Sequence, residues 1–590
     1  MFWLRYTEPI LNVTRKRLSR GQFIMVLAAL TGITSGAIAV LLKSSVHYIQ
    51  QFLSSVSVFG WTYVFFPFVG ILLTVWVIQQ FFDGKLERGV PSVLYAIAQR
   101  SSFIPRVNTY LHAIASALTV GFGGSAGLEA PIVATGSAIG ANYGKIYRTN
   151  YPERTLLLAS GAAGGIAAAF NAPIAGVMFA IEVLLTEAAV SHFIPLLIAS
   201  AAGALFSKLL LNEGILFAFS ISDNLEAYHL PFYLLLGILA GLQSVYYARV
   251  THWIESFFLR YKHHPYRRAA LGGLALIIMC TFLPPLFSEG YSSLTFLAGN
   301  NPKMLLQHPF LPDLPETEWV LLILVAAISL LKVFATAITL ASGGYGGNFA
   351  PSLFVGAYLG FFFARLINYF HWIRLPEASF TVVGMAGILS GVMHAPLTAI
   401  FLIAEITSGY ALFIPLMIVA SVALFISRHF EQYAMDTKKL ATKGDIFTSD
   451  RDHNVLTRLK LTKLLEKDVA TVYPDGTLED LVEAIRNSKR NLFAVVERSG
   501  RFVGVITLDD VKDVIFDREL YHWLVIEDVM TRPPVTLEVQ EDMESVMKKF
   551  EETNSWNLPV IENGQYLGIV SKSGIFNQYR QSLSAPREVL

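Results

Sequence analysis

The chain has 590 residues, of which 54% are hydrophobic and only 15% are charged, a composition that excludes an ordinary soluble globular protein. Its formal net charge of +1 excludes the strongly basic surface that a nucleic-acid partner requires, and its single cysteine, Cys280, excludes an internal disulfide framework. About half of the 45 basic and 44 acidic residues lie after position 430, so we expect a membrane domain followed by a soluble one.

The first predicted element follows a short basic segment, residues 1–21. The cluster from Arg15 to Arg20 immediately precedes an apolar run over 22–43, which is too long for a cleaved signal peptide. We therefore predict a retained first span, and the excess of positive charge places the N-terminus in the cytoplasm. An integral, multi-pass protein of the plasma (inner) membrane is expected.

Stretches long enough to cross a bilayer continue to about residue 430. They are predicted near 22–43, 60–81, 193–212, 230–250, 268–287, 318–341, 378–404 and 412–427. Between them lie short or glycine-broken segments at 110–120, 131–144, 157–169 and 172–186. These are too short for each to cross singly. We therefore expect an all-α membrane domain over 22–430, in which tilted and partly spanning helices pack into a compact bundle.

One short segment begins with a glycine-rich turn that carries a carboxylate, Gly123-Gly124-Ser125-Ala126-Gly127-Leu128-Glu129-Ala130-Pro131. A carboxylate at membrane depth is costly unless it faces a cavity, a pore or a partner, so Glu129 is a candidate functional residue. The glycines allow backbone N–H groups to turn toward a bound anion. Gly127 and Leu128 are therefore candidate anion-binding residues.

The same turn recurs 220 residues later as Gly343-Gly344-Tyr345-Gly346-Gly347-Asn348-Phe349-Ala350-Pro351, with Phe349 in the place of Glu129. The correspondence continues to Glu182 and Glu405, at an offset of 223. Two copies of one membrane unit are therefore present. Internal repeats that meet at half-helices are typical of transporters, whose helix N-termini present positive dipole ends to an anion.

These motifs resemble those of the CLC family of chloride channels and proton-coupled chloride exchangers, which run roughly G-S-G-I-P, G-[KR]-E-G-P and G-x-F-x-P. The second resembles Gly127–Pro131, the third matches Gly347–Pro351, and the first is a weaker match at Glu87–Pro91. The resemblance implies two inverted repeats, transport of chloride or another small anion, and a homodimer in membrane lipid with one pore per subunit. It implies no enzyme activity, no required cofactor and no metal site.

The resemblance also implies roles for single residues. Glu129 would gate the pore, because a carboxylate between helix ends takes the anion's place when ionised and leaves it when protonated. Gly347, Asn348 and Phe349 would turn backbone N–H groups toward the chloride at a helix N-terminus. The simpler alternatives are a glutamate that only caps a helix and a proline that only starts one.

The chain departs from the family at two pore positions. Arg88 stands where a chloride-contacting serine usually lies, so it either attracts anions or turns into the cytoplasmic entrance. The segment that usually carries a pore tyrosine aligns Asp436 with that tyrosine. Tyr433 lies almost one helical turn earlier and is the other candidate for an anion-contacting residue.

A third departure concerns coupling to protons. Glu182 is followed by Val183, where many exchangers of the family carry a second glutamate that accepts protons from inside. We therefore favour a channel, with a proton-coupled exchanger as the alternative, in which Glu182, Glu187 or a file of water carries the proton. Because Glu182 has a repeat partner in Glu405, we expect a hydrogen-bonded structural role for it.

A polar linker at 431–461 leads into a second repeat, whose strand, turn, strand and helix patterns recur 64 residues apart. The tail over 462–590 resembles a pair of CBS domains, at about 462–520 and 521–590. Such a pair is an α/β module and would lie in the cytoplasm. It would regulate the membrane domain.

The first CBS copy carries a candidate site for an adenine nucleotide. Thr507 and Asp510 match the hydroxyl and the aspartate with which CBS domains hold such a ligand. In the second copy Gly574 replaces the aspartate. We therefore expect either one nucleotide site or a purely structural module.

Two hypotheses come from other classes of protein. The pattern Gly-x-Ser-x-Gly at Gly123–Gly127, with His394 in the opposite repeat, suggests an intramembrane serine hydrolase, but a nucleophile elbow needs a preceding strand. A CBS-linked divalent-cation transporter would need several carboxylates together, whereas Glu129, Glu182 and Glu405 are separated by anion-type motifs. We rank both below anion transport.

Overall fold

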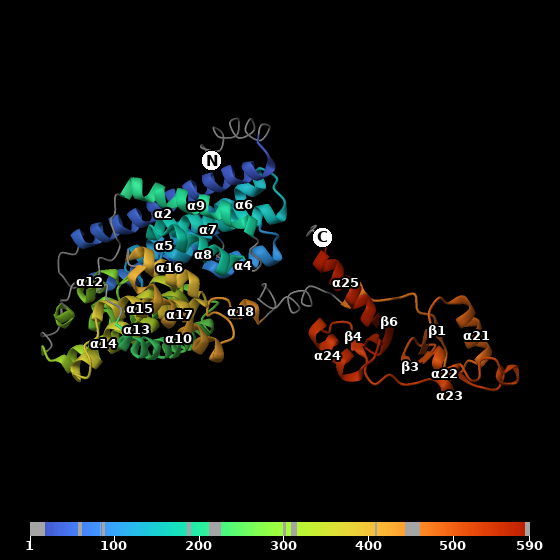
Figure 1. Ribbon diagram of the computed structural model, residues 1–590. Coiled ribbons are helices and arrows are strands. Elements are labelled where there is room, and N and C mark those ends of the chain that lie inside the picture. The colour runs from blue at the N-terminus through green and yellow to red at the C-terminus, as the bar shows by residue number, and fades with distance from the viewer. Residues whose placement is uncertain are drawn as a thin grey trace. The chain divides into compact units, whose positions relative to one another are not determined.

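The computed structural model describes residues 18–56, 62–82, 84, 89–185, 190–211, 226–298, 302–307, 315–407, 410–442 and 461–584. The chain divides into two compact units, Met1–Ile446 and Phe447–Leu590 (Figure 1). The described part of the first unit is helical, whereas the named strands all belong to the second.

The first unit is a bundle of mostly apolar helices. They are α2 (Arg20–Val56), α3 (Phe66–Phe82), α4 (Gly89–Gln99), α5 (Asn108–Gly121), α6 (Glu129–Ile146), α7 (Tyr151–Phe170), α8 (Pro173–Phe179), α9 (Val190–Leu211), α10 (Leu230–Leu259), α11 (Pro265–Phe282), α12 (Tyr291–Ala298), α13 (Glu318–Ser342), α14 (Phe349–Tyr369), α15 (Glu377–Met393), α16 (Pro396–Ile406), α17 (Phe413–Phe430) and α18 (Lys438–Ala441). Among the described residues, seven helices are long and apolar enough to cross a membrane. The prediction of an all-α, multi-pass membrane domain is confirmed.

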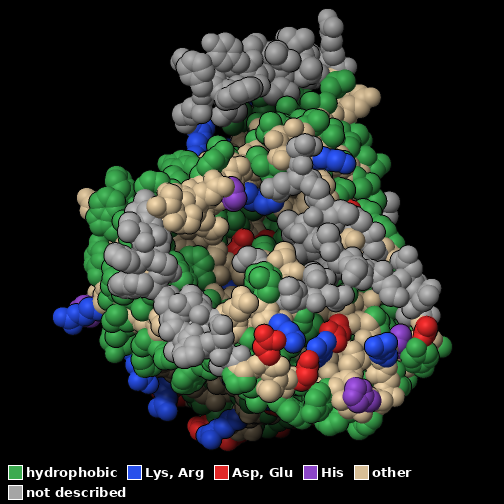
Figure 2. Space-filling model, turned by 90° about the vertical axis from the view of Figure 1, so that its left-hand side faces the viewer, with side chains coloured by type: hydrophobic (Ala, Val, Ile, Leu, Met, Phe, Trp, Pro, Cys, Tyr) green, Lys and Arg blue, Asp and Glu red, His purple; other side chains and the backbone are tan. Residues whose placement is uncertain are grey.

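Large apolar side chains remain exposed on the outside of this bundle. Examples from five helices are Leu209, Trp253, Ile278, Ile323 and Phe425. Figure 2 shows hydrophobic side chains over much of the visible surface of this unit. Exposed apolar surface of this extent would be unstable in water and suits contact with lipid.

Two pairs of helices are each separated by two residues, the first of which has left-handed backbone. Asn171 (φ 54°) lies between α7 and α8, and His394 (φ 53°) lies between α15 and α16. Each following helix starts at a proline, whose ring is accommodated only in the first helical turn. The predicted continuous span over 378–404 is therefore wrong, because the chain breaks at His394.

The centre of the bundle is formed by four buried helices, α6 and α7 from the first repeat and α14 and α15 from the second. Glycines bring each pair into backbone contact. A Cβ on Gly140 would lie 1.9 Å from the Leu157 carbonyl oxygen, and one on Gly360 would lie 2.0 Å from that of Phe380. In Figure 1 the labelled helices from α2 to α9 lie along one side of this unit and those from α10 to α18 along the other.

The second unit contains two three-stranded sheets, ordered β1-β2-β3 and β4-β5-β6. Its elements are α20 (Leu461–Leu464), β1 (Thr471–Val472), α21 (Leu478–Asn487), β2 (Leu492–Val496), β3 (Phe502–Thr507), α22 (Leu508–Val511), α23 (Ile526–Val529), β4 (Leu537–Glu538), α24 (Met543–Thr553), β5 (Asn557–Glu562), β6 (Gln565–Ser571) and α25 (Lys572–Ser584). The antiparallel strands of each sheet turn at Gly500 (φ 86°) and Gly564 (φ 81°). The predicted repeat of strand, turn, strand and helix is confirmed.

Candidate functional site

The two glycine-rich turns lie against each other. The Gly127 N–H donates to the Gly347 carbonyl at 2.9 Å, and the Gly347 N–H donates to the Gly127 carbonyl at 2.8 Å. A Cβ on Gly127 would lie 2.9 Å from the Cβ of Ala350, and one on Gly347 would lie 2.6 Å from the Cβ of Ala130. Only glycine fits this contact, which brings the positive ends of the α6 and α14 dipoles together.

Hydrogen bonds of Tyr345 stabilise the second glycine-rich turn. The Tyr345 N–H donates to the Thr119 hydroxyl at 2.9 Å. The Tyr345 hydroxyl lies 2.5 Å from His112 Nδ1 and accepts a hydrogen bond from the Gly89 N–H at 3.2 Å. This network, which the sequence motifs did not reveal, ties the start of α4 to the turn before α14.

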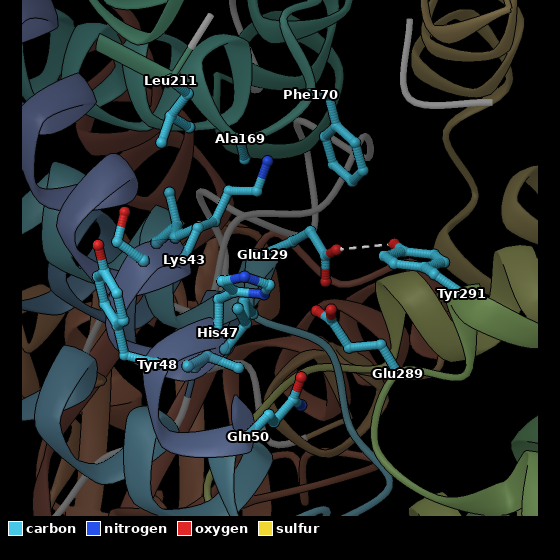
Figure 3. A pocket seen from close by; sticks show the side chains of 14 residues that line it. Lys43, His47, Tyr48, Gln50, Glu129, Ala169, Phe170, Leu211, Glu289 and Tyr291 are labelled. Carbon is cyan, nitrogen blue, oxygen red and sulfur yellow. Dashed lines mark hydrogen bonds between the residues drawn. The ribbon is translucent and has the colours of Figure 1, made fainter. Parts of the chain in front are cut away.

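Glu129 is the first residue of α6 and is only 4% exposed. Its Oε2 accepts a hydrogen bond from the Ala350 N–H at 3.3 Å, at the start of α14. Its Oε1 accepts one from the Tyr291 hydroxyl at 3.2 Å (Figure 3). The carboxylate therefore occupies a helix N-terminus, a place suited to a bound anion.

A pocket of about 350 Å³, here called the vestibule pocket, opens on one side of Glu129. Its lining is polar as well as apolar: Lys43, Ser44, Val46, His47, Tyr48, Gln50, Leu128, Glu129, Ile132, Ala169, Phe170, Leu211, Glu289 and Tyr291. Figure 2 shows a hollow in this face of the molecule with acidic side chains inside it and basic and histidine side chains at its edge. The sequence motifs contributed only Leu128 and Glu129 to this pocket.

A smaller cavity of about 10 Å³, here called the inner cavity, borders Glu129 from another direction. Its lining is Val90, Glu129, Ala130, Val133, Ile166, Phe179, Asn348, Phe349, Met393 and Asp436. A volume of this size holds about one water molecule. Of the residues that line the two spaces, Glu129 alone borders both.

Asn348 and Phe349, two of the expected anion-binding residues, line the inner cavity. The Asn348 side chain donates to Asp436 Oδ1 at 2.8 Å and accepts from the Tyr247 hydroxyl at 3.4 Å. Asp436 thus borders the cavity. Tyr433 instead packs against the apolar core of the bundle.

Residues 70–428, well over half of the chain, match the family model for the voltage gated chloride channel. The chain belongs to this family. Two CBS domains match at 461–517 and 526–580, so the resemblance to a CLC protein with a CBS pair is confirmed.

Relatives of this CLC protein carry the names of chloride channels. It is 28% identical over 486 residues to chloride channel protein CLC-f of Arabidopsis thaliana, covering 72% of this chain but only 60% of that protein. It is 29% identical over 363 residues to the voltage-gated ClC-type chloride channel ClcB of an Escherichia coli strain, covering 61% of this chain and 81% of ClcB.

Solved structures share the fold. A slow cyanobacterial Cl−/H+ antiporter superposes with a TM-score of 0.61 at 21% identity, covering 72% of this chain and 98% of that structure. A eukaryotic CLC transporter superposes with the same TM-score at 18% identity, covering 93% of this chain and 97% of that one. The fold of this CLC protein is therefore shared with transporters.

Glu182 and Glu405 form a reciprocal pair across the two CLC repeats. Glu182 accepts hydrogen bonds from the N–H groups of Leu397 and Thr398, at the start of α16. Glu405 accepts hydrogen bonds from the N–H groups at the start of α8, including that of Ala175 at 2.8 Å. Each acid caps a helix of the other repeat, the structural role expected for Glu182.

Some expected site residues lie outside the described residues. They are Glu87 and Arg88 of the first motif and Glu187 of the candidate proton route. Val183 is described and packs against the apolar core of this CLC protein.

Ser125 has no catalytic geometry among the described contacts of this CLC protein. Its N–H donates to the Thr339 hydroxyl at 3.2 Å, and its hydroxyl lies 3.5 Å from that of Thr336. His394 lies at the break between α15 and α16, with Arg428 as a charged neighbour. The hydrogen bonds of Ser125 therefore stabilise the turn before α6, as those of Tyr345 stabilise the turn before α14.

In the first CBS domain, Thr507 and Asp510 close the start of α22. The N–H and the hydroxyl of Thr507 both donate to Asp510 Oδ2 at 2.7 Å. Asp510 is exposed and Thr507 is half-buried.

In the second CBS domain, Glu466 lies beside Gly574, the residue that stands where the first copy has an aspartate. Glu466 Oε1 accepts a hydrogen bond from the Ser571 hydroxyl at 2.5 Å and would lie 3.0 Å from a Cβ on Gly574. Arg490 pairs with Glu466 and with Asp468, and its guanidinium lowers the pKa of the Asp468 carboxyl.

Proposed function

We propose that the protein carries chloride through the vestibule pocket and the inner cavity, and that Glu129 gates this path. The supporting observation is the bond from the Ala350 N–H to Glu129, at the point where both spaces meet. An ionised carboxylate occupies the helix N-terminus that would otherwise bind an anion. Protonation removes the charge and weakens the hydrogen bond, so that the side chain leaves and chloride enters.

The position of Asp436 in the chain suggests which end of the path faces the cytoplasm. Asp436, at the inner cavity, lies in the segment that follows α17 and precedes the CBS domains in the chain. We therefore assign the inner cavity to the cytoplasmic side, together with the basic N-terminus and the CBS tail. The vestibule pocket then faces the outside of the plasma membrane.

Passive conduction is the mode that we favour. Val183 offers no proton acceptor, and Glu182 is already bonded to the start of α16. In proteoliposomes with an imposed chloride gradient, chloride should therefore move without uphill movement of protons, as recorded by an internal pH dye. Protons driven uphill at a fixed ratio to chloride would establish the alternative, a proton-coupled exchanger.

An adenine nucleotide is the ligand that we propose for the first CBS domain. Replacing Asp510 with alanine in the full-length protein should weaken binding of a fluorescent ATP analogue by about tenfold or more, since a hydrogen bond to a charged group is lost. Asp509 is its exposed neighbour in sequence, so Asp509→Ala is the matched control. If wild-type protein binds no nucleotide, or Asp510→Ala binds it equally well, the CBS pair is a structural module.

The assembly that we propose is a homodimer with one path in each subunit. It follows from the CLC resemblance. Single-molecule photobleaching in liposomes should show two steps for most particles. A majority of single steps would reject the dimer.

A further inference from the structure

A second acid faces Glu129 in the vestibule pocket. Glu289 lies in the loop between a short helical turn, Pro284–Leu286, and α12. Figure 3 shows its carboxylate turned toward that of Glu129. It lines this pocket together with Leu128 and interacts electrostatically with Glu129. Two acids from distant parts of the chain therefore meet beside one pair of helix N-termini.

The loop that carries Glu289 is held by buried polar contacts. Lys332, on α13, has no exposed surface, and its ammonium group donates to the Leu286 carbonyl, directly before this loop, and to the Ser288 carbonyl within it, the latter at 2.8 Å. Gln50 donates to the Ser288 hydroxyl at 3.0 Å. Lys332 also interacts electrostatically with Glu289, which compensates part of the cost of burying its charge. The structure thus fixes the place of Glu289.

The charged and titratable side chains that line the vestibule pocket with Glu289, or interact with it electrostatically, come from four helices. They are Lys43, His47 and Tyr48 of α2, Glu129 of α6, Tyr291 of α12 and Lys332 of α13. Glu129 is the one other acid among them. Two carboxylates in one site repel each other when both are ionised, so a proton that enters the pair is shared between them.

We propose that Glu289 is a second titratable residue of the gate and acts through Glu129 by exchanging a proton with it. In this step an O–H bond of the Glu289 carboxyl breaks and an O–H bond forms on Glu129. The negative charge moves from Glu129 to Glu289, and no other reactant is needed. Ionised Glu289 then favours the protonated, open form of Glu129. The proposal rests on the gating role of Glu129.

The test is chloride efflux from proteoliposomes measured as a function of external pH. Without the charge of Glu289, Glu129 is harder to protonate. The pH of half-maximal flux in Glu289→Gln and Glu289→Ser should therefore fall by about one unit. Glu289→Asp keeps the charge and should keep the wild-type midpoint. The exposed acid Glu226 supplies the control, Glu226→Gln, and thermal melting checks that each variant is folded.

The outcomes distinguish a failure of the proposed role of Glu289 from a failure of the gating role of Glu129. An unchanged midpoint in both neutral variants overturns the proposal, and so does an equal shift in Glu289→Asp. Adding Glu289→Gln to Glu129→Gln should have no effect on the pH profile, and a further change there would show that Glu289 acts independently. If Glu129→Gln alone keeps the full pH response, the gating role of Glu129 is refuted instead.

Discussion

The Glu129→Gln protein should conduct chloride at neutral pH faster than the wild type does, and its flux should lose most of the wild type's dependence on pH. Glutamine is neutral at every pH, so it holds the Ala350 N–H less strongly than a carboxylate does. The wild-type flux should rise as the pH falls, by up to about tenfold per unit, because a single group must be protonated before the path opens. Chloride efflux from proteoliposomes between acid and neutral pH measures both.

Two comparisons make this result specific to Glu129. Glu226→Gln removes an exposed acid from the same unit and should keep the wild-type pH response. Glu129→Ala should behave like Glu129→Gln, since both lack the charge. A pH response in Glu129→Gln equal to that of the wild type would rule out the gate.

Replacing Asp436 with asparagine should raise chloride flux by about tenfold at neutral pH. Asp436 borders the inner cavity, so its ionised carboxylate repels an anion there. At an effective dielectric constant of about 20, two unit charges about 10 Å apart interact by about 1.7 kcal/mol, which corresponds to more than tenfold in rate. Asparagine keeps the shape of the side chain and an oxygen that can accept from Asn348. Initial rates of chloride efflux at one fixed gradient measure the change.

The matched variant for this position is Asp436→Glu, which keeps the negative charge. Its flux should stay at or below that of the wild type. Equal or lower flux in Asp436→Asn would show that chloride does not pass this carboxylate. The same measurement then decides whether the inner cavity belongs to the path.

The parts of the site that the sequence predicts are those that the repeat duplicates. Gly127 and Gly347 occupy equivalent positions in two copies of one motif, and only glycine allows the two copies to touch. Likewise, the equivalent positions of Glu182 and Glu405 in the two repeats predict the same structural role for both acids. In the structure, each acid caps a helix of the opposite repeat. Internal symmetry therefore carried information about contacts between residues far apart in the chain.

The vestibule side of the site could not be predicted in this way. Glu289 and Tyr291 have no partner in the repeat. Glu289 comes from a loop whose path depends on the buried contacts of Lys332, and Tyr291 begins the helix that follows it. An acid beside a glycine in an apolar region, as at Glu289, was the one available signal. The break at His394 was also missed, because an apolar run hides a single residue with left-handed backbone.

The gating role of Glu129 is tested most directly by locating a halide. Crystals of the wild type and of Glu129→Gln, soaked in bromide at neutral pH, would show the ion by its anomalous scattering. We predict bromide within hydrogen-bonding distance of the Ala350 N–H in Glu129→Gln, and none there in the wild type, whose carboxylate holds that N–H. Bromide at this N–H in both proteins, or in neither, would contradict the role of Glu129 as the gate.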